Sequence, residues 1–500
     1  MLATVNTASL LGVRGLQVTV EVHSAVGLPA FSVIGRPDDV CREARDRVRA
    51  AMLSSGLRWP NKRLTVGLAP PDERKVGAGL DVAIAVGILV AEGEVPADAV
   101  AGWGFVGELG LDGSLRSVPG MVPMVLALDR PAVVPADAVA DVRALAAAEV
   151  RGVSNLAELA LCLRGEQPWP DPPAPGAPAP PPPEPDLAEL RGQVSARTAL
   201  ELAAAGGHHL LVVGPPGSGK TMLARRLPSL LPDLDAVTAL EAILVRSAVG
   251  VSLHDGAPIG RPPFRAPHHS SSLVALVGGG TQLLRPGEIS RAHGGVLFLD
   301  ELGEFSPSVL DALRQPLEEG VVRVARARAS ATLPSRFQLV AASNPCPCGG
   351  GAPGTCECDE TARLRYVRRF SGPLLDRFDL RVLVQPASAA ELLDAAPSEP
   401  SRLVAARVAA ARRHALDRQG CLNAALGAEQ LERFAPLSNA ARSVLRDEIE
   451  LGRLTGRGLH RVRRVARTIA DLAGDEVLTS DHLGVALGLR VRLTQQAAAG

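Results

Sequence analysis

The sequence predicts an α/β protein with an α/β front domain, a second α/β domain around a parallel sheet, and a helical C-terminal domain. Three observations support this fold class. At 500 residues the chain is too long for a single hydrophobic core. Strand and helix patterns alternate along residues 1–165, and the patterns are helical from residue 401 onward. Between these regions, a glycine-rich loop joins a strand pattern to a helix pattern at residues 210–223.

The front region, residues 1–165, has the element order of an α/β domain. Strands are expected at 17–24, 31–35 and 63–70, helices at 38–56, 79–93 and 120–128, and a hairpin at 103–116 that turns at Asp112 and Gly113. The apolar run at 82–91 has half the length of a membrane span, and residues 1–15 lack the basic start of a signal peptide. We therefore expect a cytoplasmic protein without a membrane anchor.

A proline-rich linker is predicted at residues 166–185. Eleven prolines lie between residues 167 and 185, without any apolar periodicity. Such a run favours extended polyproline II and forms a semi-rigid spacer. A proline-rich ligand for a partner domain is the alternative, but domain patterns resume on both sides of the run.

The glycine-rich loop has the spacing of a phosphate-binding loop. It follows the apolar strand pattern at 210–213 and consists of Gly214, Pro215, Pro216, Gly217, Ser218, Gly219, Lys220 and Thr221. Backbone N–H groups of such a loop surround nucleotide phosphates at the positive end of the following helix. Lys220 is expected to contact the β and γ phosphates, and the Thr221 hydroxyl is expected to ligate Mg²⁺.

Two later strand patterns end in residues that suit nucleotide hydrolysis. The apolar run 296–299 is followed by Asp300 and Glu301, and the run 337–343 by Asn344. In a parallel sheet these side chains emerge at the same edge as the phosphate loop. Asp300 is expected to hold Mg²⁺ through water, Glu301 to activate the attacking water, and Asn344 to help position that water. The residues therefore imply Mg²⁺-dependent ATP hydrolysis.

Two basic segments lie between these strand patterns. Residues 261–280 are rich in Arg, His, Ser and Gly, and residues 321–336 carry four arginines, no acid and the alternation of a hairpin. Arginines of a hairpin such as Arg326 and Arg328 can follow a phosphate backbone in a ring channel, whereas the alternative is a solvated basic edge. His268 and His269 lack a cysteine or acid at ligand spacing, which favours a polar loop role over metal binding.

Four cysteines, Cys346, Cys348, Cys356 and Cys358, form two Cys-x-Cys pairs around a glycine-rich loop. In a reducing compartment this spacing predicts a metal site, and four thiolates in tetrahedral arrangement suit Zn²⁺. An iron–sulfur cluster and free thiols are the alternatives. Four protein ligands leave no open coordination position, so we expect a structural clamp on an inserted loop.

The chain as a whole is electrically neutral, with 53 basic and 53 acidic residues. Contacts with nucleic acid must therefore come from local arginine patches. Lysine occurs only at positions 62, 75 and 220, and a compact ammonium at position 220 suits phosphate oxygens better than a planar guanidinium.

The order of these motifs resembles the YifB/ComM family of magnesium-chelatase-like AAA+ ATPases. The phrases that carry the resemblance are the phosphate loop, LFLDE, AASNPCPCG, LLDRFDL and RVARTIADLAG, in this order along nearly the whole chain. The resemblance implies a Lon-protease-like front domain at 1–165, an AAA+ core at 186–386 and a helical lid at 387–500. Lon-type proteases use a Ser–Lys dyad, whereas the matching positions hold Gly79 and Val122 here. The front domain is therefore expected to serve docking or assembly, without peptidase activity.

The same resemblance implies roles for arginines near the C-terminal side. Arg377 matches the arginine finger that reaches the nucleotide of the neighbouring subunit, with a salt bridge to Asp376 or Asp379 as the structural alternative. Arg457 matches the second sensor arginine of the lid, with Arg461 as the other candidate. On the lid helix, apolar residues form one stripe with arginines opposite.

The family resemblance implies a hexameric ring that moves DNA, single-stranded or branched, during recombination of incoming DNA. Recombination proteins that bind the front domain are expected partners. The alternative is a chelatase-type motor that remodels a partner enzyme for metal insertion into a porphyrin. A protein-processing machine is disfavoured by the missing dyad.

Overall fold

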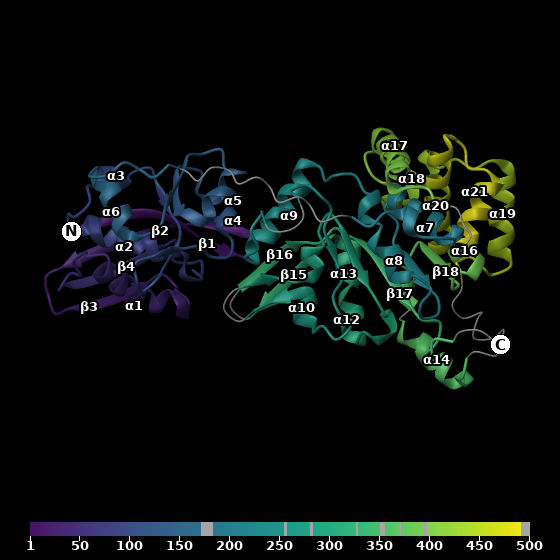
Figure 1. Cartoon of the computed structure of the whole chain (residues 1–500), viewed down its shortest axis with the longest axis horizontal. Helices are drawn as coiled ribbons and strands as arrows, with labels where there is room; N and C mark the ends of the chain where they lie inside the picture. The colour runs from purple at the N-terminus through teal and green to yellow at the C-terminus, as the bar shows by residue number, and fades with distance from the viewer. Residues whose placement is uncertain are drawn as a thin grey trace.

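The computed structural model describes residues 1–171, 184–254, 258–280, 284–326, 329–350, 356–370, 372–393 and 398–491. The molecule is elongated, with the front region at one end and the C-terminal helices at the other (Figure 1). Most of the expected proline-rich linker, residues 172–183, lies outside the described residues. None of the helices in the described ranges is both long and apolar enough to span a membrane.

The front region is a mixed sheet with helices packed against it. The strands are ordered β3-β4-β2-β1-β5-β8-β9. Their bounds are β1 (Leu2–Leu11), β2 (Arg14–Ala25), β3 (Ala30–Ile34), β4 (Arg63–Ala69), β5 (Gly104–Phe105), β8 (Ala132–Pro135) and β9 (Val150–Val153). The helices are α1 (Asp39–Ser54), α2 (Asp81–Ala91), α3 (Ala97–Val100), α4 (Met121–Leu128), α5 (Val139–Arg143) and α6 (Leu156–Arg164). The hairpin that turns at Gly113 joins β6 (Glu108–Leu109) to β7 (Leu115–Arg116).

The expected strands and helices of this region are confirmed, but strand β1 was not anticipated. Two of its buried positions are occupied by Thr7 and Ser9, which weaken the apolar alternation by which a strand is recognised. The strand nevertheless pairs with β2 along its whole length, from Leu2 opposite His23 to Leu11 opposite Arg14.

The central region contains a fully parallel sheet in the order β11-β14-β17-β10-β18. Its strands are β10 (Leu210–Val213), β11 (Phe264–Arg265), β14 (Val296–Leu299), β17 (Gln338–Ser343) and β18 (Leu380–Leu383). Every residue of β10, β14 and β17 is buried, as expected for strands covered on both faces. Because the strands are parallel, their carboxyl ends meet at one edge of the sheet.

Short helices and hairpins surround this sheet. The helices are α7 (Val194–Gly206), α8 (Lys220–Arg225), α9 (Ala236–Ala248), α10 (Leu273–Val277), α11 (Glu288–Arg291), α12 (Pro307–Ala312), α13 (Arg314–Glu319), α14 (Glu360–Arg369), α15 (Gly372–Leu375) and α16 (Ala389–Leu393). The expected basic hairpin is formed by β15 (Val321–Arg326) and β16 (Ala329–Pro334), and β12 (Gly278–Gly279) pairs with β13 (Arg285–Pro286).

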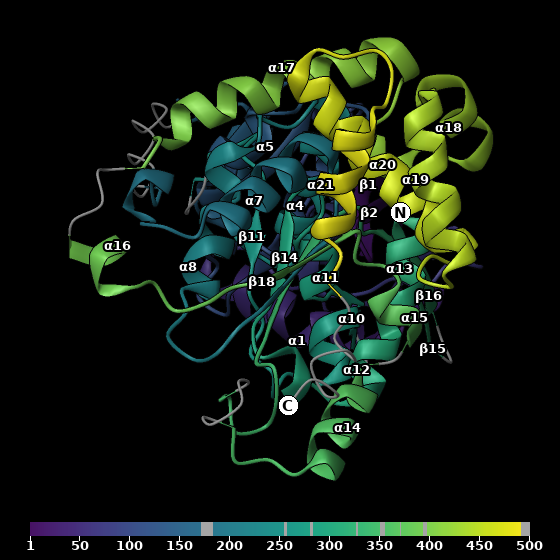
Figure 2. The ribbon, with the colours of Figure 1, turned by 90° about the vertical axis from the view of Figure 1, so that its right-hand side faces the viewer.

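The C-terminal region is helical, as expected. It comprises α17 (Ser401–Gln419), α18 (Ala428–Phe434), α19 (Asn439–Glu450), α20 (Gly456–Ala473) and α21 (Ser480–Gly488). These helices gather at one side of the sheet, whereas α14 projects away from them (Figure 2). They share an apolar core with α7 and with buried residues of β10, so lid and sheet pack as one unit.

The arginines of α20 differ from the expected stripe. Arg463 and Arg467 are buried, and Arg467 is among the largest fully buried side chains of the described chain. Arg467 bonds Asp471 and the backbone carbonyls of Asp475 and Glu476. Each buried guanidinium group is surrounded by hydrogen-bond acceptors. These hydrogen bonds therefore stabilise the interior of the C-terminal helical region.

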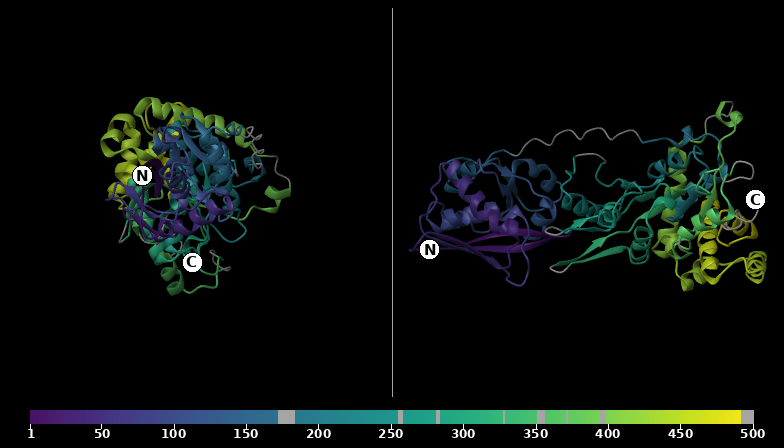
Figure 3. Two further views of the ribbon diagram at one scale, coloured as in Figure 1. Left: turned by 90° about the vertical axis from the view of Figure 1, so that its left-hand side faces the viewer. Right: turned by 90° about the horizontal axis from the view of Figure 1, so that it is seen from below.

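The front region is docked on the central region through α4 and α9. Ser247 of α9 accepts a backbone hydrogen bond from Gly120 (2.8 Å) and, through its hydroxyl, one from Val122 (3.2 Å). A Cβ at Gly12, in the β1–β2 turn, would lie 2.9 Å from Ala331 Cβ of the basic hairpin. The hairpin lies beside the tips of β1 and β2 when the molecule is seen from below (Figure 3).

Candidate functional site

The phosphate loop lies between β10 and α8, as the sequence predicts. Gly217 and Gly219 have φ angles of 76° and 79°, which glycine adopts without strain. The Lys220 ammonium donates hydrogen bonds to the carbonyls of Gly214 (2.7 Å) and Pro215 (2.8 Å). It must release these carbonyls to bind phosphate oxygens.

The expected Mg²⁺ ligands meet at this loop. The Thr221 hydroxyl donates a hydrogen bond of 2.7 Å to Asp300 Oδ2. Hydroxyl and carboxylate oxygens suit Mg²⁺, so these two side chains could hold the ion together with phosphate oxygens. Burial lowers the pKa of Lys220, and the carboxylates of Asp300 and Glu301 act against that shift.

Asn344 follows β17 and faces the loop from the neighbouring strand. Val213 of β10 pairs with Ser343 of β17, so Asn344 lies level with Gly214. Its Oδ1 accepts a hydrogen bond of 3.2 Å from Lys220. The structure thus brings Asn344, Lys220 and the acidic pair together at one edge of the sheet.

Glu301 emerges from β14 with a φ of 52°, a left-handed conformation that is uncommon for a residue with a side chain. Its Oε2 lies 3.1 Å from Nδ1 of His269. His269 was expected to have a polar role in its loop. Its partner is the carboxylate of Glu301, the candidate general base.

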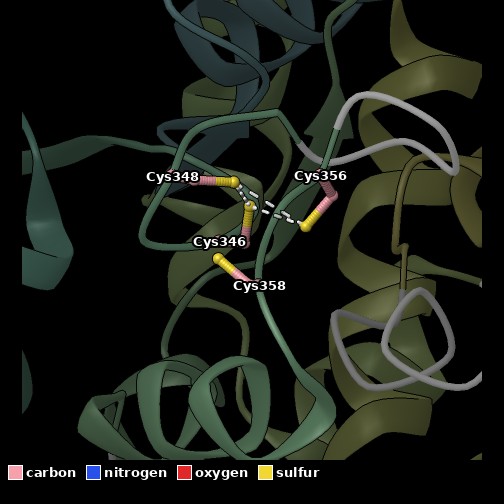
Figure 4. A group of neighbouring side chains, drawn as sticks. All are labelled: Cys346, Cys348, Cys356 and Cys358. Carbon is pink, nitrogen blue, oxygen red and sulfur yellow. Dashed lines mark hydrogen bonds between the residues drawn. The ribbon is translucent and has the colours of Figure 1, made fainter.

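The four cysteines converge (Figure 4). Their sulfur atoms all lie within 4.8 Å of one another, and Cys346 Sγ is 3.3 Å from Cys348 Sγ and 3.6 Å from Cys356 Sγ. The backbone N–H of Gly350, and then that of Glu357, lowers the pKa of the Cys348 thiol to about 6. Thiolates in this arrangement fit a tetrahedral metal ion.

The cysteine cluster is packed against the phosphate loop, which the sequence did not reveal. A Cβ at Gly349 would lie 2.8 Å from Pro216 Cδ. On the other side of the cluster, α14 places the Tyr366 hydroxyl 3.2 Å from Ser343 Oγ, at the end of β17. The segment with the cysteines and α14 therefore contacts both the phosphate loop and the end of β17.

Arg377 lies at the opposite edge of the sheet. It precedes β18, whose first residue, Leu380, pairs with Leu210 at the start of β10. Its guanidinium donates hydrogen bonds to Glu318 of α13 and to the carbonyl of Pro373 (2.6 Å). The expected structural alternative, a salt bridge to Asp376 or Asp379, is wrong in its partner, because Arg377 pairs with Glu318 while Asp376 pairs with Arg381 and Asp379 with Arg461.

Asp379 instead connects the finger segment to the lid. It is buried and accepts a hydrogen bond of 2.6 Å from Arg461, and its other oxygen is 3.1 Å from His208 Nδ1. Arg461 also bonds the carbonyl of Arg377 (3.1 Å). Arg457, one helical turn earlier, is exposed on the first turn of α20. Of the two sensor candidates, Arg461 thus contacts the segment that carries Arg377.

The two positions that match the Lon-type dyad, Gly79 and Val122, are both buried. Gly79 is buried, and a Cβ there would lie 3.3 Å from Val118 and 3.7 Å from Met124 of α4. Val122 is 1% exposed, and its backbone N–H is bonded by Ser247 of the central region. At these two positions the chain therefore carries neither the hydroxyl nor the amine of the Lon-type dyad.

The basic hairpin is formed, but its tip lies only partly within the described chain. Arg328 is outside the described residues, and the side chain of Arg326 is not described. Arg323 pairs with Glu319, and Arg336 lies 3.4 Å from Glu241. The expectation that Arg326 and Arg328 contact DNA stays a prediction.

One residue of the site, Gln193, escaped the sequence analysis. Gln193 donates a hydrogen bond of 2.5 Å from its side-chain amide to the carbonyl of Ser218 in the phosphate loop. A lone glutamine ahead of a helix carries no pattern that points to a loop 25 residues away. His269 was noticed, but its partner is set by strand register, which a single sequence does not show.

Family profiles match most of the chain. The profile described as "Magnesium chelatase, subunit ChlI" matches residues 186–392, the profile "Subunit ChlI of Mg-chelatase" matches 20–137, and the profile "Magnesium chelatase, subunit ChlI C-terminal" matches 398–490.

Full-length relatives share this organisation. An uncharacterised protein of Mycobacterium tuberculosis is 45% identical over 96% of this chain and 97% of its own length. The uncharacterised protein YifB of Escherichia coli is 41% identical over 98% of this chain and 97% of its own. The competence protein ComM of Haemophilus influenzae is 40% identical over 99% of both chains. A partial similarity, 31% identity over 136 residues, relates 26% of this chain to 25% of Lon protease 2 of Bacillus subtilis.

Proposed function

Because the chain belongs to the YifB/ComM family of magnesium-chelatase-like proteins, we propose that it is a Mg²⁺-dependent ATPase whose ring moves along DNA. The observation that carries the ATPase proposal is the meeting of Lys220, Thr221, Asp300 and Asn344 at the carboxyl edge of the parallel sheet. Glu301, adjacent to this group, would accept the proton of the attacking water.

The shared active site is supported by the position of the arginines. Arg377 precedes β18 at the amino edge of the sheet, whereas the phosphate loop follows β10 at the carboxyl edge. The length of the sheet separates the two edges, which supports a role for Arg377 at the nucleotide of a neighbouring subunit. The exposed Arg457, one turn before Arg461 on α20, would assist the same neighbouring nucleotide. We propose a closed ring, with six subunits as the family resemblance implies.

DNA as the substrate is supported by the basic hairpin and by the relative named a competence protein. The chelatase alternative is supported by the names of the matching family profiles. We favour DNA because the hairpin lies beside the β1–β2 turn of a front domain that, by the family resemblance, chelatase ATPase subunits lack. Recombination proteins are proposed to bind the front domain.

We also propose that the cysteine cluster binds one Zn²⁺ ion. The four sulfur atoms, Cys346 to Cys358, provide the tetrahedral donor set that zinc accepts in structural sites. With all four positions filled by protein, the ion would hold the cluster against Pro216 and take no part in the reaction.

The test is the ATP hydrolysis rate of the purified protein with single-stranded, duplex and branched DNA. We expect stimulation by at least one DNA form, with binding that weakens steeply as salt rises, since the contacts are arginine to phosphate. Replacing Arg326 and Arg328 by Ala should remove stimulation and spare basal hydrolysis. Hydrolysis indifferent to every DNA form, but raised by an enzyme of porphyrin metal insertion, would favour the alternative.

A further inference from the structure

A cleft separates the lid helix α17 from the amino edge of the parallel sheet. One wall is formed by Arg412, Arg413 and Leu416 of α17, and the other by residues 294–295 and 336–338 at the amino ends of β14 and β17. The helix itself lies over α7 (Figure 2). The volume of the cleft, about 630 Å³, is that of a small-molecule site. Because the phosphate loop follows β10 at the carboxyl edge, the cleft is separate from the proposed ATP site.

Arg412 brings a positive charge to this cleft without a carboxylate partner. Its Nε donates a hydrogen bond of 2.8 Å to the carbonyl of Ala204 in α7, and no carboxylate of the described chain pairs with its guanidinium. Burial lowers the pKa of Arg412 to about 10, because desolvation disfavours the charged form. The group is still charged at neutral pH, so an anion that enters the cleft would compensate a charge that the protein leaves uncompensated.

The charge balance of the lining also favours an anion. Two more guanidinium groups line the cleft, those of the exposed Arg413 and of Arg336, which lies 3.4 Å from Glu241. The lining includes two acids, and both are engaged. Asp235 accepts backbone hydrogen bonds at the start of α9, and Asp233 pairs with an arginine that does not line the cleft. Three arginines therefore face two carboxylates that already have partners.

The rest of the lining suits a planar apolar group. Phe337 is half-buried at the amino end of β17, and four leucines surround the same space, namely Leu231, Leu234, Leu416 and Leu422. An aromatic ring can stack on any nucleobase, and guanidinium groups match the geometry of phosphate oxygens. The cleft thus combines the two kinds of contact that a nucleotide needs.

We propose that this cleft is a second nucleotide-binding site, with the base against Phe337 and the phosphates at Arg412. The ligand is either a free nucleotide or one nucleotide unit of a DNA strand, since both carry the same base and phosphate groups. A nucleotide bound here would contact both α17 and the sheet, and would therefore hold the lid on the core. The inference does not depend on hydrolysis or on movement along DNA, because neither the phosphate loop nor the basic hairpin contributes to the cleft.

The experiment measures ADP binding to the full-length protein by isothermal titration calorimetry. Wild type should bind two ADP molecules per chain, and Lys220→Ala, which disables the phosphate loop, should bind one. In the Lys220→Ala background, Arg412→Gln should weaken the remaining site about tenfold or more, as loss of a charged hydrogen-bond donor does. Arg402→Gln, at an exposed arginine of α17 outside the cleft, is the matched control and should change the dissociation constant less than about twofold.

A second variant keeps the test valid if Arg412→Gln does not fold, since Arg412 also bonds α7. Leu416 is 47% exposed, so Leu416→Glu adds a negative charge to the cleft without disturbing the core. It should also weaken ADP binding about tenfold or more in the Lys220→Ala background. Lys220→Ala protein that binds no ADP at millimolar concentration would overturn the inference. ADP binding that Leu416→Glu leaves unchanged would place the nucleotide at the phosphate loop and would overturn it as well.

Competition distinguishes the two sources of the ligand. ADP bound to Lys220→Ala is challenged with a short oligodeoxythymidine. Displacement that Leu416→Glu abolishes would assign the cleft to a DNA strand, whereas ADP binding that the oligonucleotide does not affect would assign it to a free nucleotide. If ATP hydrolysis of wild type is indifferent to DNA while Lys220→Ala binds ADP in the cleft, the second site stands and the DNA proposal fails.

Discussion

Replacing Arg377 by Ala is expected to stop ATP hydrolysis while leaving ATP binding nearly intact. The reason is that Arg377 and the phosphate loop lie at opposite edges of the parallel sheet. The four residues of β10 rise about 13 Å between the edge near Arg377 and the edge with the phosphate loop. In the proposed ring, Arg377 would stabilise charge on the γ phosphate held by a neighbouring subunit, and only in the transition state.

The size of the effect follows from the chemistry of the finger and from the contacts that Arg377 makes at rest. An arginine finger contributes about 10³- to 10⁵-fold in kcat, or at least about 4 kcal/mol in the barrier. Within its own chain, Arg377, whose side chain is 14% exposed, pairs with Glu318, whose side chain is 67% exposed, and also bonds the Pro373 carbonyl, so loss of these contacts should cost about 1–3 kcal/mol in stability. Catalysis should therefore collapse while the fold persists.

The assay mixes two inactive proteins. Glu301→Gln damages the site of its own chain, and Arg377→Ala damages the site of the neighbour. In a randomly mixed ring at equal amounts, about one quarter of the interfaces join an intact Glu301 to an intact Arg377, so activity should return to about that fraction of wild type. Glu318→Gln is the matched control, because it breaks the resting ion pair and leaves the finger in place.

Two results would refute this reasoning. Mixtures that co-assemble but stay inactive at every ratio, while each mutant regains activity with wild type, would place Arg377 within its own site or in a structural role. Equal loss of hydrolysis in Glu318→Gln would show that the resting pair, and not the finger, is what matters.

Three further predictions concern the metal, its neighbourhood and pH. Elemental analysis should find about one zinc per chain, and Cys356→Ser should lose it; native protein without metal and with freely alkylated thiols would contradict the site. Gly349→Ala, which places a Cβ 2.8 Å from Pro216 at a φ of +81°, should weaken ATP binding about tenfold, whereas Gly484→Ala, with open space around its Cβ, should not. Burial lowers the pKa of His209 from 6.5 to about 4, so the unfolded chain takes up a proton first as pH falls. The free energy of unfolding should therefore decrease as the pH falls from 6.5 to about 4. In thermal unfolding scans, His209→Gln should show a smaller decrease over this pH range.

The sequence determined the elements that carry the chemistry, because their signals are local. The phosphate loop, the acidic pair and Asn344 each stand at the end of an apolar run, and a parallel sheet brings such ends to one edge. The metal site was predicted in the same way, because a short loop keeps the four cysteines close together in space. These groups meet as expected.

Tertiary packing decided the relations between distant segments, which no local pattern encodes. The register of β11 and β14 brings His269 to Glu301, and close packing brings Gly349 to Pro216. The partner of Arg377 is Glu318, whereas the nearby Asp379 is taken by Arg461 of the lid. A sequence names the charged groups, but which of them pair depends on burial and on the spacing of elements far apart in the chain.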